Sequence, residues 1–120
     1  MKKKILVVDD QEDFRILVVR MLTRNGFETI QADNGINALE QANAHLPDLI
    51  ISDVMMYSGS GFILRELLKK EPQTAKIPLI LISAMAQDTQ AWGLDAKVDY
   101  LSKPITEEQL ISAVRRKIEP

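Results

Sequence analysis

The sequence predicts a three-layer α/β sandwich, in which a parallel sheet lies between two layers of helices. Short apolar runs rich in β-branched residues recur along the chain, which is typical of strands buried on both faces. Segments with helical spacing separate these runs, so strand and helix alternate five times, and this alternation favours right-handed crossovers in a parallel sheet. A length of 120 residues suits one domain, residues 1–120, with one core.

Five segments are predicted to form the strands. Four are short apolar runs, the last of them weaker because Asp99 interrupts it, and they lie at 5–8, 49–51, 79–82 and 98–101. The fifth segment, 27–32, alternates between apolar and polar residues. Alternation indicates a strand with one face less buried, so this segment is expected at the edge of the sheet.

The first helix has the clearest pattern. Apolar residues recur at positions i, i+3, i+4, i+7 and i+8, and Asn25-Gly26 supplies its end. The residues predicted to face inward are Phe14, Leu17, Val18, Met21 and Leu22. Ile16 and Val19 are then expected roughly opposite this stripe, either as scattered surface residues or as a docking patch for a partner helix.

Three further helices have recognisable ends. The second begins at Asn34 or Gly35 and ends before Pro47, and the third follows a Ser60 cap and closes at Pro72. The last begins with the capping box Thr106-Glu-Glu-Gln109, and its acidic first turn and basic last turn suit the helix dipole. Residues 84–97 contain a glycine and few apolar positions, so a fourth helix there is expected to be short or irregular.

Composition excludes several classes of protein. With 15 basic and 17 acidic side chains the net charge is −2, and the basic residues form no stripe for nucleic acid. The absence of cysteine excludes disulfides and thiolate zinc sites and is compatible with a cytoplasmic location. The apolar run that follows the N-terminal lysines is too short for a signal peptide or a membrane span.

Polar residues follow four of the predicted strands. Asp9 and Asp10 come after the first, Asp53 after the third, Ser83 after the fourth and Lys103 after the fifth. Because ligands of open α/β sheets bind outside the carboxyl ends of the strands, these five residues are expected to share one crevice.

Three carboxylates in a partly dry crevice repel one another unless a cation lies between them. Oxygen ligands that leave positions for water favour Mg²⁺ as this cation. Lys103 adds a positive charge and Ser83 a hydroxyl donor, and neither is needed merely to hold a metal ion. Both are expected where an anion with several oxygens, such as a phosphoryl group, arrives at the metal.

The motifs Asp9-Asp10, Asp53, Ser83-Ala84 and Lys103-Pro104, in this order, resemble the receiver domain of bacterial two-component response regulators. The resemblance extends over essentially the whole chain. It implies a flavodoxin-like three-layer α/β/α sandwich with a five-stranded parallel sheet of order 2-1-3-4-5.

The resemblance also implies a function. Asp53 would accept a phosphoryl group from a histidine kinase or histidine phosphotransfer protein, and the Mg²⁺ would be held by Asp10, Asp53 and the backbone carbonyl of Met55. Asp9 would orient a metal-bound water, and Lys103 would pair with a phosphoryl oxygen. Such a domain catalyses only its own phosphorylation and dephosphorylation, and therefore does not count as an enzyme.

Ser83 and Tyr100 are implied as the switch. Ser83 would move toward a phosphoryl oxygen and Tyr100 would turn into the vacated space, so that the last strands and helices control a downstream protein or effector domain. No contact of this domain with nucleic acid or membrane is expected, and it is expected to be a monomer or weak dimer, either alone or as part of a longer regulator.

The chain departs from the receiver pattern after Asp53. Met56 and Gly61 fit the pattern, but Tyr57 stands where proline is expected. The segment between Ser83 and Lys103 is also somewhat short, which leaves open the form of the fourth helix.

Two other functions remain as alternatives. A phosphatase or phosphotransferase with an aspartate nucleophile commonly has a second acid two residues further on, and position 55 is methionine. A protein-interaction domain that is never phosphorylated would not need the set of five residues. Taken alone, Asp9-Asp10 also fits a strand end that caps the next helix, and Ser83 is a common residue after a strand.

Overall fold

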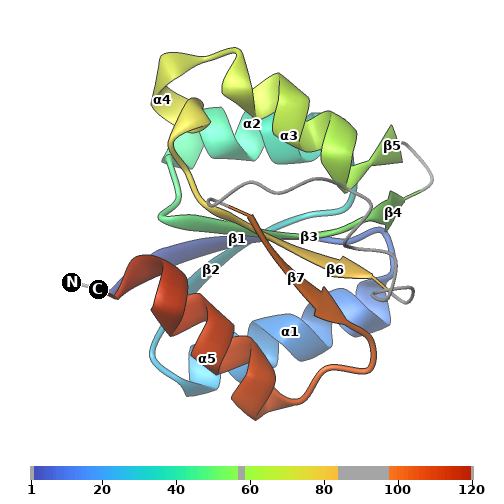
Figure 1. Cartoon of the computed structure of the whole chain (residues 1–120), viewed down its shortest axis with the longest axis vertical. Coiled ribbons are helices and arrows are strands. Elements are labelled where there is room, and N and C mark those ends of the chain that lie inside the picture. Colours follow the sequence, from blue (N-terminus) through green and yellow to red (C-terminus); the bar gives the residue numbers. More distant parts are fainter. Residues whose placement is uncertain (1, 57–58, 84–97, 120) are drawn as a thin grey trace.

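The computed structural model describes residues 2–56, 59–83 and 98–119, and within them every side chain except those of residues 55, 56, 59, 60 and 62. Five parallel strands form the main sheet in the order β2-β1-β3-β6-β7 (Figure 1). In chain order they are β1 Lys4–Val8, β2 Glu28–Ala32, β3 Leu49–Asp53, β6 Leu79–Ser83 and β7 Val98–Ser102. The predicted order 2-1-3-4-5 is confirmed, and the alternating strand β2 lies at an edge.

Helices cover both faces of this sheet (Figure 1). One face carries α1 (Glu12–Arg24) and α5 (Glu107–Ile118). The other carries α2 (Gly35–His45), α3 (Gly61–Lys69) and the one-turn helix α4 (Pro72–Ala75). The predicted three-layer sandwich is therefore confirmed.

Each face of the sheet has its own core, because successive side chains of a strand point to opposite faces. The core on the α1/α5 side includes Ile5, Val7, Leu49, Ile51, Ile80 and Ile82 from the strands, with Val18, Leu22, Leu110 and Val114 from the helices. The core on the α2/α3 side includes Leu6, Val8, Ile50, Leu79, Leu81 and Val98, with Ala38, Ala42, Leu64 and Leu68. The three inner strands β1, β3 and β6 are covered by helices on both faces, which explains why their apolar runs are continuous.

Helix α1 is turned slightly from its predicted orientation. Val18, Met21 and Leu22 are buried as expected, but Leu17 is 44% exposed. Val19 instead packs against the α1/α5 core. Leu17 and Val19 stand on the two borders of the apolar stripe, and the position of the sheet decides which border is covered. The predictions that Leu17 is inward and that Val19 faces away were therefore wrong.

The helices on the other face begin largely as predicted. The Asn34 side chain caps α2 by accepting a hydrogen bond of 2.8 Å from the backbone N–H of Asn37, and α3 begins at Gly61, directly after Ser60. Pro72 does not merely end α3: it begins α4, where its fixed φ suits the first helical position. A short hairpin of β4 (Met55–Met56) and β5 (Gly59–Ser60) was not predicted. Tyr57 and the expected fourth helix at 84–97 lie outside the described residues.

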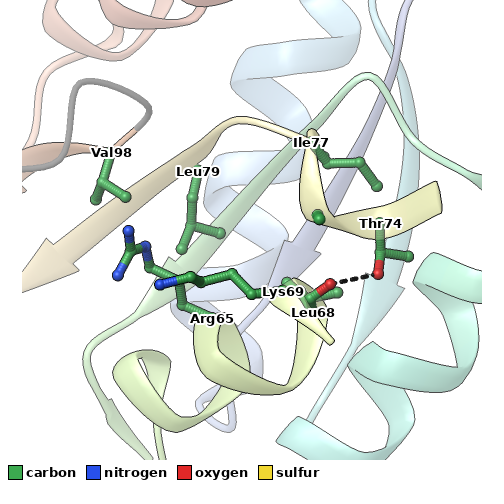
Figure 2. Close-up of a pocket in the computed structure, with 8 residues that line it drawn as sticks. Arg65, Leu68, Lys69, Thr74, Ile77, Leu79 and Val98 are labelled. Carbon is green, nitrogen blue, oxygen red and sulfur yellow. Dashed lines mark hydrogen bonds between the residues drawn. The ribbon is translucent and has the colours of Figure 1, made fainter. Parts of the chain in front are cut away.

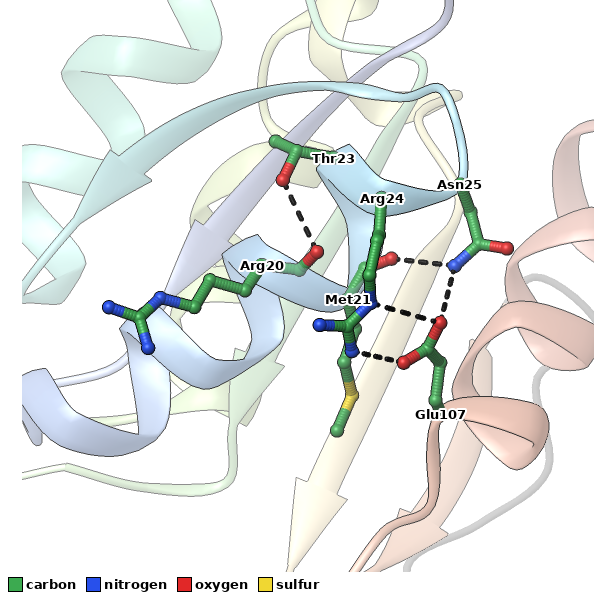
Figure 3. A network of polar contacts seen from close by, with 6 residues as sticks. All are labelled: Arg20, Met21, Thr23, Arg24, Asn25 and Glu107. Atoms are coloured by element: carbon green, nitrogen blue, oxygen red, sulfur yellow. Dashed lines mark hydrogen bonds and ion pairs between the residues drawn. The ribbon is translucent and has the colours of Figure 1, made fainter.

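Helix α5 is fixed at its first residue. The predicted capping box is present, with Thr106 and Gln109 exchanging side-chain-to-backbone hydrogen bonds. The carboxylate of Glu107 also pairs with Arg24 and accepts a hydrogen bond of 2.9 Å from the Asn25 side chain at the end of α1 (Figure 3). The pKa of Glu107 lies below its usual value, and the hydrogen bond from Arg24 is the main cause. This cluster joins the end of α1 to the beginning of α5.

Gly61 allows α3 to begin directly against the end of β3. A Cβ atom at this position would lie 2.8 Å from the Asp53 carbonyl oxygen and 2.8 Å from the Leu81 side chain. The Gly61 N–H also donates a hydrogen bond of 3.0 Å to the carbonyl of Val54. Glycine is therefore required here by close packing.

We predict that Gly61→Ala lowers the free energy of unfolding by about 1–3 kcal/mol, since the added methyl group overpacks the junction. Gly35→Ala is the matched control, because nothing lies within 4 Å of a Cβ atom there. Alanine in the first turn of α2 should leave stability unchanged or raise it slightly. Urea unfolding of the two variants measures both effects, and equal stability of the two would contradict this steric account.

Candidate functional site

The polar residues predicted from the sequence gather at the carboxyl edge of the sheet. Asp9 follows β1, Asp53 ends β3, Ser83 ends β6 and Lys103 follows β7. These four strands are consecutive neighbours in the sheet and all run in the same direction. The parallel topology alone therefore brings these residues to one edge.

An ion pair between Asp53 and Lys103 lies at the centre of this edge. The Lys103 ammonium is 2.9 Å from Asp53 Oδ2, and the two side chains are 22% and 7% exposed. The Lys103 backbone N–H donates a hydrogen bond of 2.9 Å to the carbonyl of Ser83, and the Val54 N–H donates one of 2.9 Å to the carbonyl of Ile82. These backbone bonds extend the β3-β6-β7 pairing past the strand ends and fix the positions of the paired charges.

Asp9 is almost completely buried, with 2% of its surface exposed. Its carboxylate accepts a hydrogen bond of 2.8 Å from the backbone N–H of Gln11. The pKa of Asp9 is raised to about 6, mainly by burial; the negative charges of Asp53 and Asp10 contribute to the rise, and the Gln11 hydrogen bond and the Lys103 charge oppose it. The carboxylates predicted to crowd one another are thus close enough to interact.

Two residues of α1 complete the site and were not predicted as part of it. Arg15 donates a hydrogen bond of 2.8 Å to the carbonyl of Asp9, and a second of 2.9 Å to the side chain of Gln31 on β2. The ring of Phe14 lies under the Lys103 ammonium, which is 4.4 Å from the ring centroid. The sequence predicts Phe14 only as part of the apolar stripe of α1. Nothing in the sequence around it indicates a contact with Lys103.

Strand alternation divides the site between the two faces of the sheet. Asp53 continues the Leu49 and Ile51 side of β3, which faces α1 and α5. Ser83 continues the Leu79 and Leu81 side of β6, which faces α2 and α3. Tyr100 pairs with Leu81 in register and packs against this second core. The predicted switch residues therefore share a face with each other but not with the carboxylate.

The donor set suits a hard divalent cation with an open coordination sphere. Asp10 is partly exposed beside buried Asp9, and the charges of Asp53 and Asp10 add to the rise in the Asp9 pKa that burial mainly causes. Among the residues that the structure describes, no three acidic, histidine or cysteine side chains form a closed metal cage. Two carboxylates with a backbone carbonyl and water would match Mg²⁺, which keeps several waters when bound to proteins.

A separate pocket of about 170 Å³ lies at the other end of the sheet. Leu79 and Val98, the first residues of β6 and β7, form part of its wall, and Arg65 and Lys69 extend over it from α3 (Figure 2). Thr74 in the pocket wall donates a hydrogen bond of 2.6 Å to the Leu68 carbonyl. Because it lies at the amino ends of the strands, this pocket is not part of the acidic site.

Acids and a lysine at the carboxyl edge of an open parallel sheet are typical of a domain that binds a charged ligand there. The family model described as "Response regulator receiver domain" matches residues 5–115. The chain belongs to this family, so it is a receiver domain of the two-component response regulator type. The family resemblance seen in the sequence is confirmed.

Individual relatives agree with this assignment. The chain is 36% identical to the phosphate regulon transcriptional regulatory protein PhoB of Klebsiella pneumoniae over all of its own length, but it spans only 55% of PhoB. It is 32% identical to PilH of Pseudomonas aeruginosa, with 92% of this chain and 93% of PilH covered. The structure of the chemotaxis response regulator CheY4 of Vibrio cholerae superposes with a TM-score of 0.85 at 29% identity, covering 98% of this chain and 99% of CheY4.

None of the helices in the described part of the chain combines the length and the apolar character needed to cross a bilayer.

We predict that Asp9→Asn stabilises the protein in metal-free buffer above pH 6. Folding raises the Asp9 pKa from 3.8 to about 6, so the folded state binds the proton more tightly and ionised Asp9 opposes folding above pH 6. This shift corresponds to about 3 kcal/mol. The gain in unfolding free energy should therefore be largest above pH 6 and shrink several-fold by pH 4.

Denaturant unfolding with EDTA at several pH values measures this gain. Asparagine keeps the oxygen that accepts the Gln11 hydrogen bond, so only the charge changes. Asp33→Asn, an exposed carboxylate that follows β2, is the control and should show no comparable gain. An Asp9→Asn gain of equal size at pH 4 and pH 7.5 would mean that the charge is not the cause.

Proposed function

We propose that this domain accepts a phosphoryl group on the carboxylate of Asp53 from a histidine kinase or a histidine phosphotransfer protein. The observation that carries the proposal is the Asp53–Lys103 ion pair, a largely buried carboxylate held by an ammonium at the carboxyl edge of the sheet. Membership of the receiver family supports the same reaction.

In this reaction a carboxylate oxygen of Asp53 attacks the phosphorus of the donor phosphohistidine. The new O–P bond forms as the P–N bond breaks, and the imidazole nitrogen takes the bonding electron pair. Lys103, which now bonds Oδ2, offsets the negative charge of the arriving phosphoryl oxygens. The product is an acyl phosphate on Asp53.

Asp10, Asp53 and the backbone carbonyl of Met55 would hold Mg²⁺, and Asp9 would orient a water bound to it. When bound, the ion neutralises the oxygens of the phosphoryl group. The carboxylates would favour binding of the ion at the carboxyl edge of the sheet, because their mutual repulsion falls when a cation lies between them.

We propose that Ser83 and Tyr100 convert phosphorylation into a conformational change. The phosphoryl group adds a charge of about −1.5 to −2 next to the end of β6. When the Ser83 hydroxyl moves toward the phosphoryl group, it leaves space on its own face of the sheet. Tyr100 packs on that face, on the neighbouring strand β7, two residues before the last paired residue of that strand. Tyr100 turning inward would shift an existing equilibrium of β7 and α5.

The altered surface would act on a downstream protein or an effector domain. We propose that the domain works in the cytoplasm and catalyses only its own phosphorylation and dephosphorylation. PhoB is named a transcriptional regulator, but PilH matches this chain over nearly its full length without that name.

Incubation with acetyl phosphate and Mg²⁺, followed by intact-protein mass spectrometry, tests the proposed acceptor. The wild type and the Asp33→Asn control should each gain one phosphoryl group, and Asp53→Asn should gain none because its amide is not a nucleophile. Phosphorylation of Asp53→Asn to the wild-type extent would disprove the acceptor assignment. Repeated turnover of a phosphomonoester would instead support the phosphatase alternative.

Thermal unfolding with and without Mg²⁺ tests the proposed metal ligands. Millimolar Mg²⁺ should raise the melting temperature of the wild type, because an ion that binds only the folded state stabilises it by mass action. Asp10→Asn should melt higher than the wild type in EDTA, since one repelling charge is gone, and it should lose most of the response to Mg²⁺. An unchanged midpoint in every arm would exclude Asp10 as a ligand.

A further inference from the structure

We propose that Phe14 is a positioning residue for Lys103, which it holds beside the phosphoacceptor by a cation–π contact. The inference rests on the proposed function and adds to it a residue that approaches the reaction only through Lys103. It follows from the position of the Lys103 ammonium, which lies close to both the Phe14 ring and the Asp53 carboxylate.

The distances place the Lys103 ammonium between two partners. Its Nζ atom is 2.9 Å from Asp53 Oδ2 and 4.4 Å from the centroid of the Phe14 ring. A cation within about 6 Å of a ring centroid is attracted by the negative face of the ring, and the attraction grows as water is removed. The Lys103 side chain is only 22% exposed, so much of this water is absent.

The ring is itself held firmly. Phe14 belongs to the first turn of α1 and packs against the α1/α5 core. Lysine, by contrast, carries a compact charge on a flexible four-carbon stem with many rotamers. The helix thus supplies the rigid half of the contact, and Lys103 needs it because its own stem does not fix the ammonium.

A ring offers Lys103 something that a second carboxylate would not. Phosphorylation makes one Asp53 oxygen the bridging oxygen of an acyl phosphate, and Lys103 must then shift toward a phosphoryl oxygen. Hydrogen bonds depend steeply on angle, whereas attraction to a ring face changes gradually with position. Phe14 therefore keeps the ammonium at the site during this shift without adding a fourth acidic group beside Asp9, Asp10 and Asp53.

Beryllofluoride with Mg²⁺ is the probe, since it occupies the place of the phosphoryl group on the aspartate without a covalent phosphate. Phe14→Leu should raise the concentration needed for half-saturation about 3- to 10-fold, the range expected from losing a partly desolvated cation–π contact. Phe14→Tyr keeps the ring and should stay within about 2-fold of the wild type. Equal weakening in both variants would indicate a role in packing alone and overturn the inference.

Graded fluorination of the ring separates electrostatics from shape. Phenylalanine analogues with one, two and three fluorine atoms placed at position 14 have nearly the same size but a progressively less negative ring face, so half-saturation should rise stepwise. The trifluoro analogue at Phe27, a buried ring of the same core, is the matched control and should leave beryllofluoride binding unchanged. A flat series at position 14 would overturn the inference even if Phe14→Leu failed to fold.

The result with the wild-type protein distinguishes failure of this inference from failure of the proposed function. If wild-type protein does not bind beryllofluoride, the phosphoacceptor function fails with it. A double-mutant cycle of Phe14→Leu and Lys103→Met then tests the contact by itself. The measured quantity is the denaturant midpoint of unfolding without Mg²⁺ or beryllofluoride. Additive midpoint changes in that cycle would rule out the contact, and non-additive changes would support it.

Discussion

The Asp53–Lys103 ion pair is the interaction on which the rest of the site depends. A carboxylate that is only 7% exposed needs a compensating charge within hydrogen-bond distance, and Lys103 supplies one at 2.9 Å. Its effect extends to Asp9, whose pKa is raised mainly by burial and also by the charges of Asp53 and Asp10, and is lowered by the Lys103 charge. One lysine thus offsets part of the repulsion among three acids, and any further cation at this edge relieves the remainder.

Sheet topology makes this pairing possible between residues 50 positions apart. β6 lies between β3 and β7, so the two partners reach each other over the end of a strand whose last residue is Ser83. Backbone hydrogen bonds from Val54 and Lys103 to the β6 strand continue the ladder beyond its ends. In the proposed function, a change at the ion pair would act on the backbone at the ends of β3, β6 and β7.

Much of this arrangement could be predicted from the sequence, because runs such as 49–51 and 79–82 identify buried strands and parallel strands end at a common edge. What could not be predicted depends on how elements pack. The helical pattern of α1 does not reveal which border of the stripe the sheet covers, so Leu17 and Val19 were misplaced. Phe14 reads as an ordinary core residue, and only its distance from Lys103 shows the second contact.

The division of the site between two faces of the sheet would separate the proposed phosphorylation chemistry from the proposed conformational response. By strand alternation, Asp53 continues the side of β3 that faces the α1/α5 core, against which Phe14 packs. Ser83 continues the side of β6 that faces the α2/α3 core, against which Tyr100 packs. Since adjacent residues of a strand point to opposite faces, a shift of the chain at the end of β6 or β7 moves side chains on both. In the proposed switch, a group added to Asp53 would be sensed at Tyr100 through the strands.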